Sequence, residues 1–244
     1  MKIHRFYVPD IELKHDFWLH DERLLHQWNR VLRFRAGQQV VLFDGLTHDR
    51  LYKIDEIKPN EAHLLHMTDF ARKVPGKDMY LVWSLLKKDK NDWVLQKCTE
   101  LGVSHFVPLL ADRSEKTGFN VERAEKIVIE AAEQCGRSDI PSVRQPQLVS
   151  TAIESLKDKV SLLVAEQDAE QSSEQRAKGT EEQSPLIAHD SLLNNSIGVL
   201  IGPEGGWSDA EKQLFADKNV QHLNLHDFTL RAETAAVTAI GSIC

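Results

Sequence analysis

One stretch near the end of the chain constrains the fold most strongly, because an apolar run, a glycine-rich turn and a helix start follow one another directly. Residues 197–201 (Ile-Gly-Val-Leu-Ile) have the length and composition of a buried strand. The run breaks at residues 202–206 (Gly-Pro-Glu-Gly-Gly), and Ser208 with Glu211 forms a capping box, which marks a helix start. Ligands of α/β proteins bind at such glycine-bearing strand ends. A tight turn without a ligand fits the same spacing, so both interpretations stay open.

The middle of the chain repeats this alternation of strand and helix. Apolar runs predict buried strands at residues 79–84, 103–110 and 161–165, and amphipathic stretches predict helices at residues 92–101 and 123–135. Strands that alternate with helices favour a parallel sheet with crossover helices, so the predicted fold class is α/β. By contrast, residues 166–183 are polar and lack apolar periodicity, which indicates a mobile surface loop or a poorly ordered helix.

The first 72 or so residues predict a small β-rich module instead. Strands are expected at residues 40–43, 51–54 and 61–67, and residues 21–32 have apolar residues at helical spacing. Arg30, Arg33 and Arg35 cluster at the end of this predicted helix. If the helix continues, Arg30 and Arg33 share a face and could meet phosphate; the alternative is a solvated helix end. A basic stretch at residues 71–77 contains Pro75 and Gly76 and predicts the domain boundary.

Composition indicates a soluble chain in a reducing compartment. The 244 residues are 41% hydrophobic and 27% charged, an ordinary globular balance. No apolar run approaches the ~18 residues of a membrane span, and the first residues lead into no signal-peptide core. Cys98, Cys135 and Cys244 lack metal-ligand spacing and are expected to be buried thiols, with Cys135 in the core. We therefore expect a cytoplasmic protein without metal or membrane partners.

Four motifs in the order of one known family give a more specific expectation. They are Val-Leu-Arg-Phe-Arg-Ala-Gly at 31–37, Gln-Lys-Cys-Thr-Glu-Leu-Gly-Val at 96–103, Glu-Ala-Ala-Glu-Gln-Cys-Gly-Arg at 130–137, and the pair formed by residues 201–206 and 230–235. Together they resemble the RsmE family, SPOUT-class enzymes that methylate N3 of a uridine in 16S ribosomal RNA. The resemblance covers nearly the whole chain. No Gly-x-Gly-x-x-Gly follows a first strand, which disfavours a dehydrogenase that uses NAD.

The resemblance implies two domains. Residues 1–73 would be a PUA-like β-barrel that binds RNA, and residues 74–244 would be a SPOUT domain with helices on both faces of its sheet. The family further implies a deep trefoil knot near the carboxyl terminus, which no pattern in the sequence would suggest. SPOUT sites are usually completed across a subunit interface, so we expect a homodimer.

The cofactor implied by the family is S-adenosylmethionine. The glycine turn offers close approach to the backbone, and leucines can flank the adenine. The residues expected to bind it are Ile201, Gly202, Pro203, Glu204, Gly205, Gly206, Leu225, His226, Leu230, Thr234 and Ala235.

The expected catalytic residues are Arg113, Arg231 and Glu233. Uridine N3 carries a proton, so a base must remove it or an oxyanion site must favour the enolate. Glu233 and His226 are candidate bases, and Arg113 could stabilise negative charge at the carbonyls of the base. Arg231 and Glu233 could equally form a structural ion pair.

Ribosomal RNA, within the assembled small subunit, is the expected partner. Arg5, Arg30, Arg33 and Arg137 are the expected RNA-binding residues. A net charge of −7 at first argues against an RNA-binding protein, because phosphate contacts need cations. The acidic excess, however, lies within residues 148–244, so RNA contact is expected from the earlier part of the chain.

One departure from the family lies in the last loop. The family motif Leu-Gly-x-Arg-Ile-Leu-Arg reads Leu-His-Asp-Phe-Thr-Leu-Arg at residues 225–231, with His226 in place of the glycine and Phe228 in place of the first arginine. Two alternatives therefore remain beside the uridine-N3 enzyme. One is a SPOUT methyltransferase for another rRNA or tRNA nucleotide, and the other is an RNA-binding relative that no longer holds cofactor.

Overall fold

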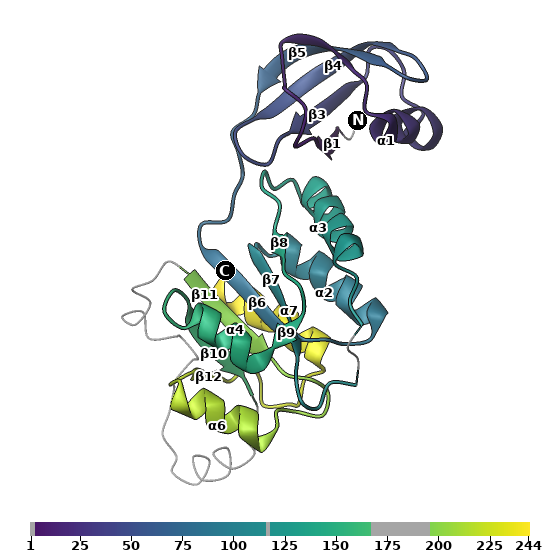
Figure 1. The fold of residues 1–244 in the computed structure, drawn as a ribbon. Helices are drawn as coiled ribbons and strands as arrows, with labels where there is room; N and C mark the ends of the chain where they lie inside the picture. Colours follow the sequence, from purple (N-terminus) through teal and green to yellow (C-terminus); the bar gives the residue numbers. More distant parts are fainter. Residues whose placement is uncertain (1–2, 116–117, 167–195) are drawn as a thin grey trace. The chain divides into compact units, whose positions relative to one another are not determined.

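The computed structural model describes residues 3–115, 118–166 and 196–244, which form two compact units (Figure 1). The first unit reaches to Val74 and also includes Ile129–Ile140, and the second comprises Pro75–Val128 and Pro141–Cys244. The stretch at residues 166–183, expected to be a mobile loop or a poorly ordered helix, lies outside the described residues except for Glu166. Among the described residues, none of the helices has the length and apolar character needed to cross a membrane.

Five strands form a mixed sheet in the first unit, in the order β1-β3-β4-β5-β2. Their bounds are β1 (His4–Tyr7), β2 (Asp16–Leu19), β3 (Gln39–Phe43), β4 (Asp49–Ile57) and β5 (Ala62–Asp69). β1 runs parallel to β3, whereas the β3–β4, β4–β5 and β5–β2 pairs are antiparallel. The three predicted strands correspond to β3, β4 and β5, so the β-rich character of this module is confirmed.

The helix predicted at residues 21–32 forms, but it is shorter and less regular than expected. Its first part is α1 (Glu22–His26), in which the Asp21 carboxylate accepts the Leu24 N–H; its second part is a π-helical segment, η1 (Gln27–Leu32). Arg33 follows in the left-handed conformation, with φ 54°. The reversal lets the Phe34 N–H reach the Trp28 carbonyl at 2.8 Å and buries Phe34. The helix therefore ends before Arg33, so it does not continue in the way that would place Arg30 and Arg33 on a shared helix face.

A buried ion pair connects the strands of the first unit. The Asp49 side chain is only 1% exposed, and the Arg5 guanidinium donates to both of its oxygens at 3.0 Å. Ser138 Oγ donates to the same carboxylate at 2.6 Å, and Arg5 also lies over the Phe43 ring. Arg137 is buried as well, and its Nε and Nη2 meet Asp139 at 3.0 and 2.6 Å. Carboxylates of the same unit therefore engage both arginines.

Seven strands form the sheet of the second unit, in the order β12-β10-β11-β6-β7-β8, with β9 also paired to β7. Their bounds are β6 (Asp78–Ser84), β7 (His105–Leu110), β8 (Ser142–Val143), β9 (Gln147–Leu148), β10 (Ser161–Ala165), β11 (Ser196–Ile201) and β12 (Gln221–Leu223). All of these pairs are parallel. The predicted α/β class with a parallel sheet is thus confirmed.

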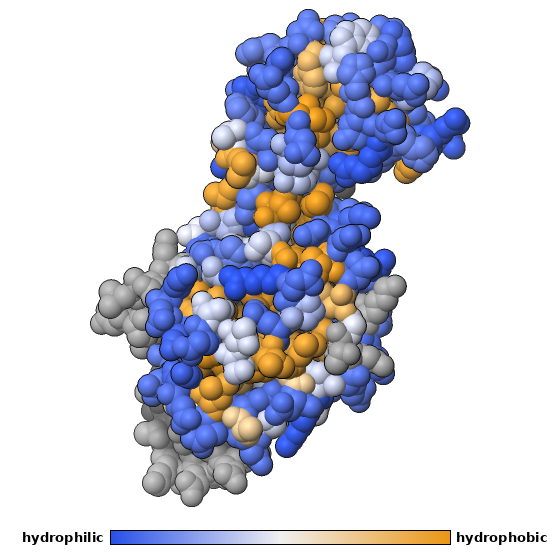
Figure 2. All heavy atoms as spheres, viewed as in Figure 1, coloured by the Kyte–Doolittle hydropathy of each residue, from blue (hydrophilic) through white to orange (hydrophobic). Residues whose placement is uncertain are grey.

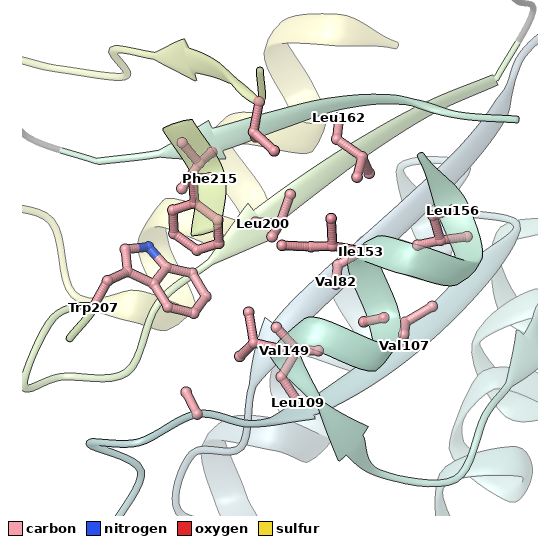
Figure 3. Packing of buried hydrophobic residues seen from close by; sticks show 14 of the residues in the cluster. Val82, Val107, Leu109, Val149, Ile153, Leu156, Leu162, Leu200, Trp207 and Phe215 are labelled. Atoms are coloured by element: carbon pink, nitrogen blue, oxygen red, sulfur yellow. The ribbon is translucent and has the colours of Figure 1, made fainter. Parts of the chain in front are cut away.

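Helices cover both faces of this sheet. They are α2 (Lys88–Glu100), α3 (Val121–Cys135), α4 (Val149–Leu156), α6 (Asp209–Asp217) and α7 (Ala232–Ile243). On one face, Ile153 of α4 and Phe215 of α6 pack with Val82 and Leu200 of the sheet, and the Trp207 ring meets Phe215 edge-on (Figure 3). Neighbouring residues of a strand point to opposite faces, so Leu81 and Val199, also buried, face away from α4. There α7 contacts β6 and β11.

Two expectations about α2 and the cysteines need correction. The helix predicted at residues 92–101 begins earlier, at Lys88, and ends at Glu100. Cys98 is buried, and burial raises the pKa of its thiol. Cys135 and Cys244 are exposed, and each lies at the carboxyl end of a helix, α3 and α7 respectively.

The pairing of Arg5 with Asp49 leads to a stability prediction. Arg5→Met should lower the free energy of unfolding by about 3–5 kcal/mol, because removing one partner leaves the other charge buried and unpaired. Arg33→Met is the matched control, since the Arg33 side chain is exposed, and it should change stability by less than about 0.5 kcal/mol. Urea unfolding of the two variants measures both effects. Equal free energies of unfolding for Arg5→Met and Arg33→Met would show that the ion pair of Arg5 and Asp49 does not stabilise this unit.

Candidate functional site

A pocket of about 480 Å³ lies in the second unit at the carboxyl ends of β10, β11 and β12. This volume falls within the range of small-molecule sites, roughly 300–1,000 Å³. Most of its walls come from the glycine turn after β11 and from the loop between β12 and α7. The lining residues are Ala165, Glu166, Ile201, Gly202, Pro203, Glu204, Gly206, Trp207, Leu223, Asn224, Leu225, His226, Phe228, Thr229, Leu230, Arg231, Ala232 and Ala235.

Parallel pairing explains why these segments meet. Ala165 at the end of β10 is aligned with Ile201 of β11 on one side and with Leu223 of β12 on the other. Three strands therefore end at the same level, and the chain must turn there three times. At Gly202 a Cβ would lie 3.0 Å from Cε2 of the Trp207 ring, so a side chain would have to displace the buried indole. Gly206 has φ 71°, a conformation that glycine adopts without strain.

Most residues expected to bind the cofactor line this pocket. The exceptions are Gly205, which lies against Arg113, and Thr234, which is exposed on α7. Apart from Arg231, the lining residues that sequence reasoning did not assign to the cofactor are Ala165, Glu166, Trp207, Leu223, Asn224, Phe228, Thr229 and Ala232. Ala165 and Glu166 lie at or directly after the end of a predicted strand, so the rule that ligands bind at strand ends could have found these two.

His226 and Phe228, the residues that depart from the family motif, form a local structure at the pocket. Their rings stack with centroids 5.1 Å apart, and the Phe228 N–H donates to His226 Nδ1 at 3.0 Å. Because Nδ1 accepts this hydrogen bond, a neutral His226 carries its proton on Nε2. The Phe228 ring is 74% exposed. The loop thus has its own hydrogen bond and stack where the family has glycine and arginine.

An ion-pair cluster ties the glycine turn to two helix starts. Lys90 Nζ, in the first turn of α2, lies 3.3 Å from both Glu204 Oε1 and Glu233 Oε2. Glu204 belongs to the turn after β11 and Glu233 to the first turn of α7. The two carboxylates, Glu233 first, raise the pKa of the Lys90 ammonium, which stays charged. Lys90, a basic residue at the start of α2, therefore has two structural partners.

The three expected catalytic residues lie in different settings around the glycine turn and the loop before α7. Arg231 lines the pocket as the residue just before α7, and its side chain is exposed. Arg113 lies outside the glycine turn, where its Nη1 donates to the Gly205 carbonyl at 3.2 Å. Glu233 faces Lys90, which favours the structural ion pair over the role of a free base.

The expected RNA-binding residues also divide into two groups. Arg5 and Arg137 are engaged by Asp49 and Asp139, which favours a structural role for both. Arg30 and Arg33, by contrast, are exposed, and so is Arg35. Within residues 3–115, 118–166 and 196–244, no carboxylate pairs with these three side chains. Over the same ranges, no cluster of three His, Cys, Asp or Glu side chains could hold a metal ion.

Comparison with known proteins places these features in a family. The model of an RNA methyltransferase domain matches residues 73–244, and that of an RNA methyltransferase PUA domain matches residues 30–65. The ribosomal RNA small subunit methyltransferase E of Rickettsia conorii is 29% identical over 100% of this chain and 96% of its own length. That of Bacillus subtilis is 28% identical over 90% of this chain and 86% of its own length.

A solved structure extends the similarity to three dimensions. The crystal structure of a ribosomal RNA small subunit methyltransferase E from Neisseria gonorrhoeae, bound to S-adenosyl methionine, superposes with a TM-score of 0.83 at 26% identity. The match covers 99% of this chain and 97% of that one. Since the methyltransferase domain model spans well over half of the chain, the family resemblance drawn from the motifs is confirmed. The chain belongs to the RNA methyltransferase domain family.

Proposed function

We propose that this protein transfers a methyl group from S-adenosylmethionine to N3 of a specific uridine in 16S ribosomal RNA. The observation that carries the proposal is the pocket at the ends of β10, β11 and β12, built by the same two segments that hold the family motifs. Relatives named ribosomal RNA small subunit methyltransferase E, one of them bound to S-adenosyl methionine, support the choice of cofactor and RNA. The uridine-N3 position rests on the family resemblance.

The pocket offers what this cofactor needs. Ile201, Leu225 and Leu230 supply an apolar wall for the adenine. Gly202 lets the backbone pass close to the Trp207 ring, because a Cβ there would lie against the indole. When bound, the sulfonium of the cofactor supplies an electrophilic methyl group. Glu166, at the end of β10, adds a carboxylate that can accept hydrogen bonds from ribose hydroxyls.

The side chains around the pocket favour charge stabilisation over removal of the N3 proton by a dedicated base. Glu233 is engaged by Lys90, and a neutral His226 has its proton on Nε2 while Nδ1 accepts a hydrogen bond. Arg113 and Arg231 both have exposed side chains. We assign these two arginines to the negative charge that develops on the uracil carbonyls when N3 releases its proton to solvent water. Fixing the two reactants in line would supply a further part of the acceleration.

RNA recognition is proposed for the first domain, residues 1–73, and methyl transfer for residues 74–244. Arg30 and Arg33 are exposed cations without a carboxylate partner in the part of the chain that the structure describes, as phosphate contacts require. The match of residues 30–65 to an RNA methyltransferase PUA domain supports this assignment. The substrate would be the assembled small ribosomal subunit, so we place the protein in the cytoplasm.

A homodimer and a trefoil knot complete the proposal. Large apolar side chains are exposed on the second unit at Trp93, Leu148 and Phe228, and Figure 2 shows hydrophobic surface interrupting the hydrophilic surface on one face of this unit. Such surface favours a subunit interface. The trefoil knot near the carboxyl terminus rests on the family resemblance.

Cofactor binding tests the proposal at Gly202. Titration calorimetry should give micromolar binding of S-adenosylmethionine, and Gly202→Val should weaken it at least tenfold, because the new side chain displaces Trp207 and fills the turn. Gly76→Val is the matched control, since a Cβ there meets nothing within 4 Å. No binding by the parent protein at millimolar cofactor, with intact circular dichroism, would contradict the proposed enzyme.

RNA binding tests the exposed arginines. Arg33→Met should weaken binding to small-subunit RNA and reduce the slope of log K against log salt by about 1, the effect expected for one lost phosphate contact. Lys157→Met, which removes a surface lysine paired with Glu154, should leave both quantities unchanged. Filter binding at several salt concentrations measures them. An unchanged slope for Arg33→Met would place the phosphate contacts elsewhere.

A further inference from the structure

Glu211 is a buried carboxylate that joins two loops far apart in sequence. Its side chain belongs to the first turn of α6, and the residue is only 6% exposed. Oε2 accepts the backbone N–H of Ser208 at 2.7 Å, as a capping box requires. Oε1 accepts the backbone N–H of Asp112 at 3.0 Å, from the loop that follows β7. Helix capping accounts for the first of these hydrogen bonds but not for the second.

Further contacts join the same two loops. Ser208 Oγ donates to Asp112 Oδ2 at 2.6 Å and accepts the Glu211 N–H at 3.2 Å. One residue further along, Arg113 donates to the Gly205 carbonyl at 3.2 Å. A Cβ on Gly205 would lie 3.3 Å from the Arg113 Cβ, so the two backbones approach closely. The loop after β7 is therefore fixed at Asp112 against the start of α6 and at Arg113 against the glycine turn.

We propose that Glu211 is a positioning residue that acts through Arg113: its carboxylate holds the loop after β7 against the glycine turn and thereby places the Arg113 guanidinium. The inference rests on the proposed function in that it assumes a role for Arg113 in methyl transfer. Glu211 suits this task because a carboxylate only accepts hydrogen bonds, and both partners here are backbone N–H groups, which no substitution except one to proline removes. Burial keeps water from replacing either hydrogen bond.

Glu211→Gln is the sharpest probe of this contact. The amide has almost the size of the carboxylate, but one oxygen becomes an NH₂ group that would face a backbone N–H, so one hydrogen bond is lost. Asp112→Ala is the matched control. It removes the side-chain contact with Ser208 but leaves the Asp112 backbone N–H, and hence both hydrogen bonds of Glu211, in place.

A double-mutant cycle on kcat separates positioning from general damage. The rate is that of methyl transfer from S-adenosylmethionine to unmethylated small ribosomal subunits, at saturating concentrations of both. Arg113→Ala should lower kcat on the order of 100-fold, the scale of losing one charge-stabilising donor. We expect Glu211→Gln to lower kcat at least 10-fold and Asp112→Ala to lower it less than 3-fold. The Glu211→Gln/Arg113→Ala double variant should be no slower than Arg113→Ala alone, because Glu211 acts through Arg113.

If the kcat of the double variant instead falls by the product of the two single-variant factors, the inference is overturned. An enzyme that Glu211→Gln merely destabilises would lose the same factor in kcat with or without Arg113. Hydrogen exchange of the protein without cofactor or RNA provides a readout that needs no activity. Glu211→Met, which removes both acceptor oxygens, should speed amide exchange at residues 111–114 and 208 while leaving β6 unchanged, and unchanged exchange at 111–114 would also overturn the inference. Absence of methyl transfer by the parent protein would contradict the proposed function, and the exchange result would still decide the contact.

Discussion

Parallel pairing of β10, β11 and β12 is the constraint on which the functional part of this molecule depends. Because Ala165, Ile201 and Leu223 end their strands at one level, three loops must leave the sheet together. At Gly202, after the end of β11, a Cβ would lie only 3.0 Å from the buried Trp207 ring. The pocket therefore follows from the sheet register and from one close approach, and its walls are loops fixed to a buried core.

Charged side chains then fix these loops at points that an apolar core does not reach. Lys90 joins the glycine turn to the starts of α2 and α7, and Glu211 joins the start of α6 to the loop after β7. Each contact combines residues from at least two segments that are separate in the chain. Polar contacts of this kind position a site more strictly than apolar packing does, because they have preferred distances and directions.

Apolar runs and helix-capping residues in the sequence predicted those strands and helix starts that depend only on neighbouring residues. The apolar runs at 79–84, 161–165 and 197–201 form β6, β10 and β11, and the capping box of Ser208 and Glu211 starts α6 as expected. The left-handed conformation of Arg33 was not predictable in this way, because it depends on burial of Phe34 beside Trp28. In the same way, the exposure of Cys135, the last residue of α3, depends on what packs against the end of that helix, and its own sequence neighbourhood does not reveal this.

In the candidate site, too, some residues could be predicted from the sequence and others could not. Family motifs located the glycine turn and the loop before α7, and most of their residues line the pocket. Partners of charged residues were not predictable, since Arg5 meets Asp49, 44 positions away, and Asp112 meets Glu211, 99 positions away. Single exposed arginines and arginines engaged in buried pairs look alike in a sequence. Only the fold separates Arg33 from Arg5.

The central claim is methylation of a uridine in small-subunit RNA, and identifying the product nucleoside tests it most directly. Small ribosomal subunits from cells that lack this gene would be incubated with the purified protein and S-adenosylmethionine, and the digested RNA analysed by mass spectrometry. The account predicts 3-methyluridine at a single position, formed only when protein and cofactor are both present. A methyl group on another atom or another nucleotide, or no methyl group from a protein that binds the cofactor, would contradict it.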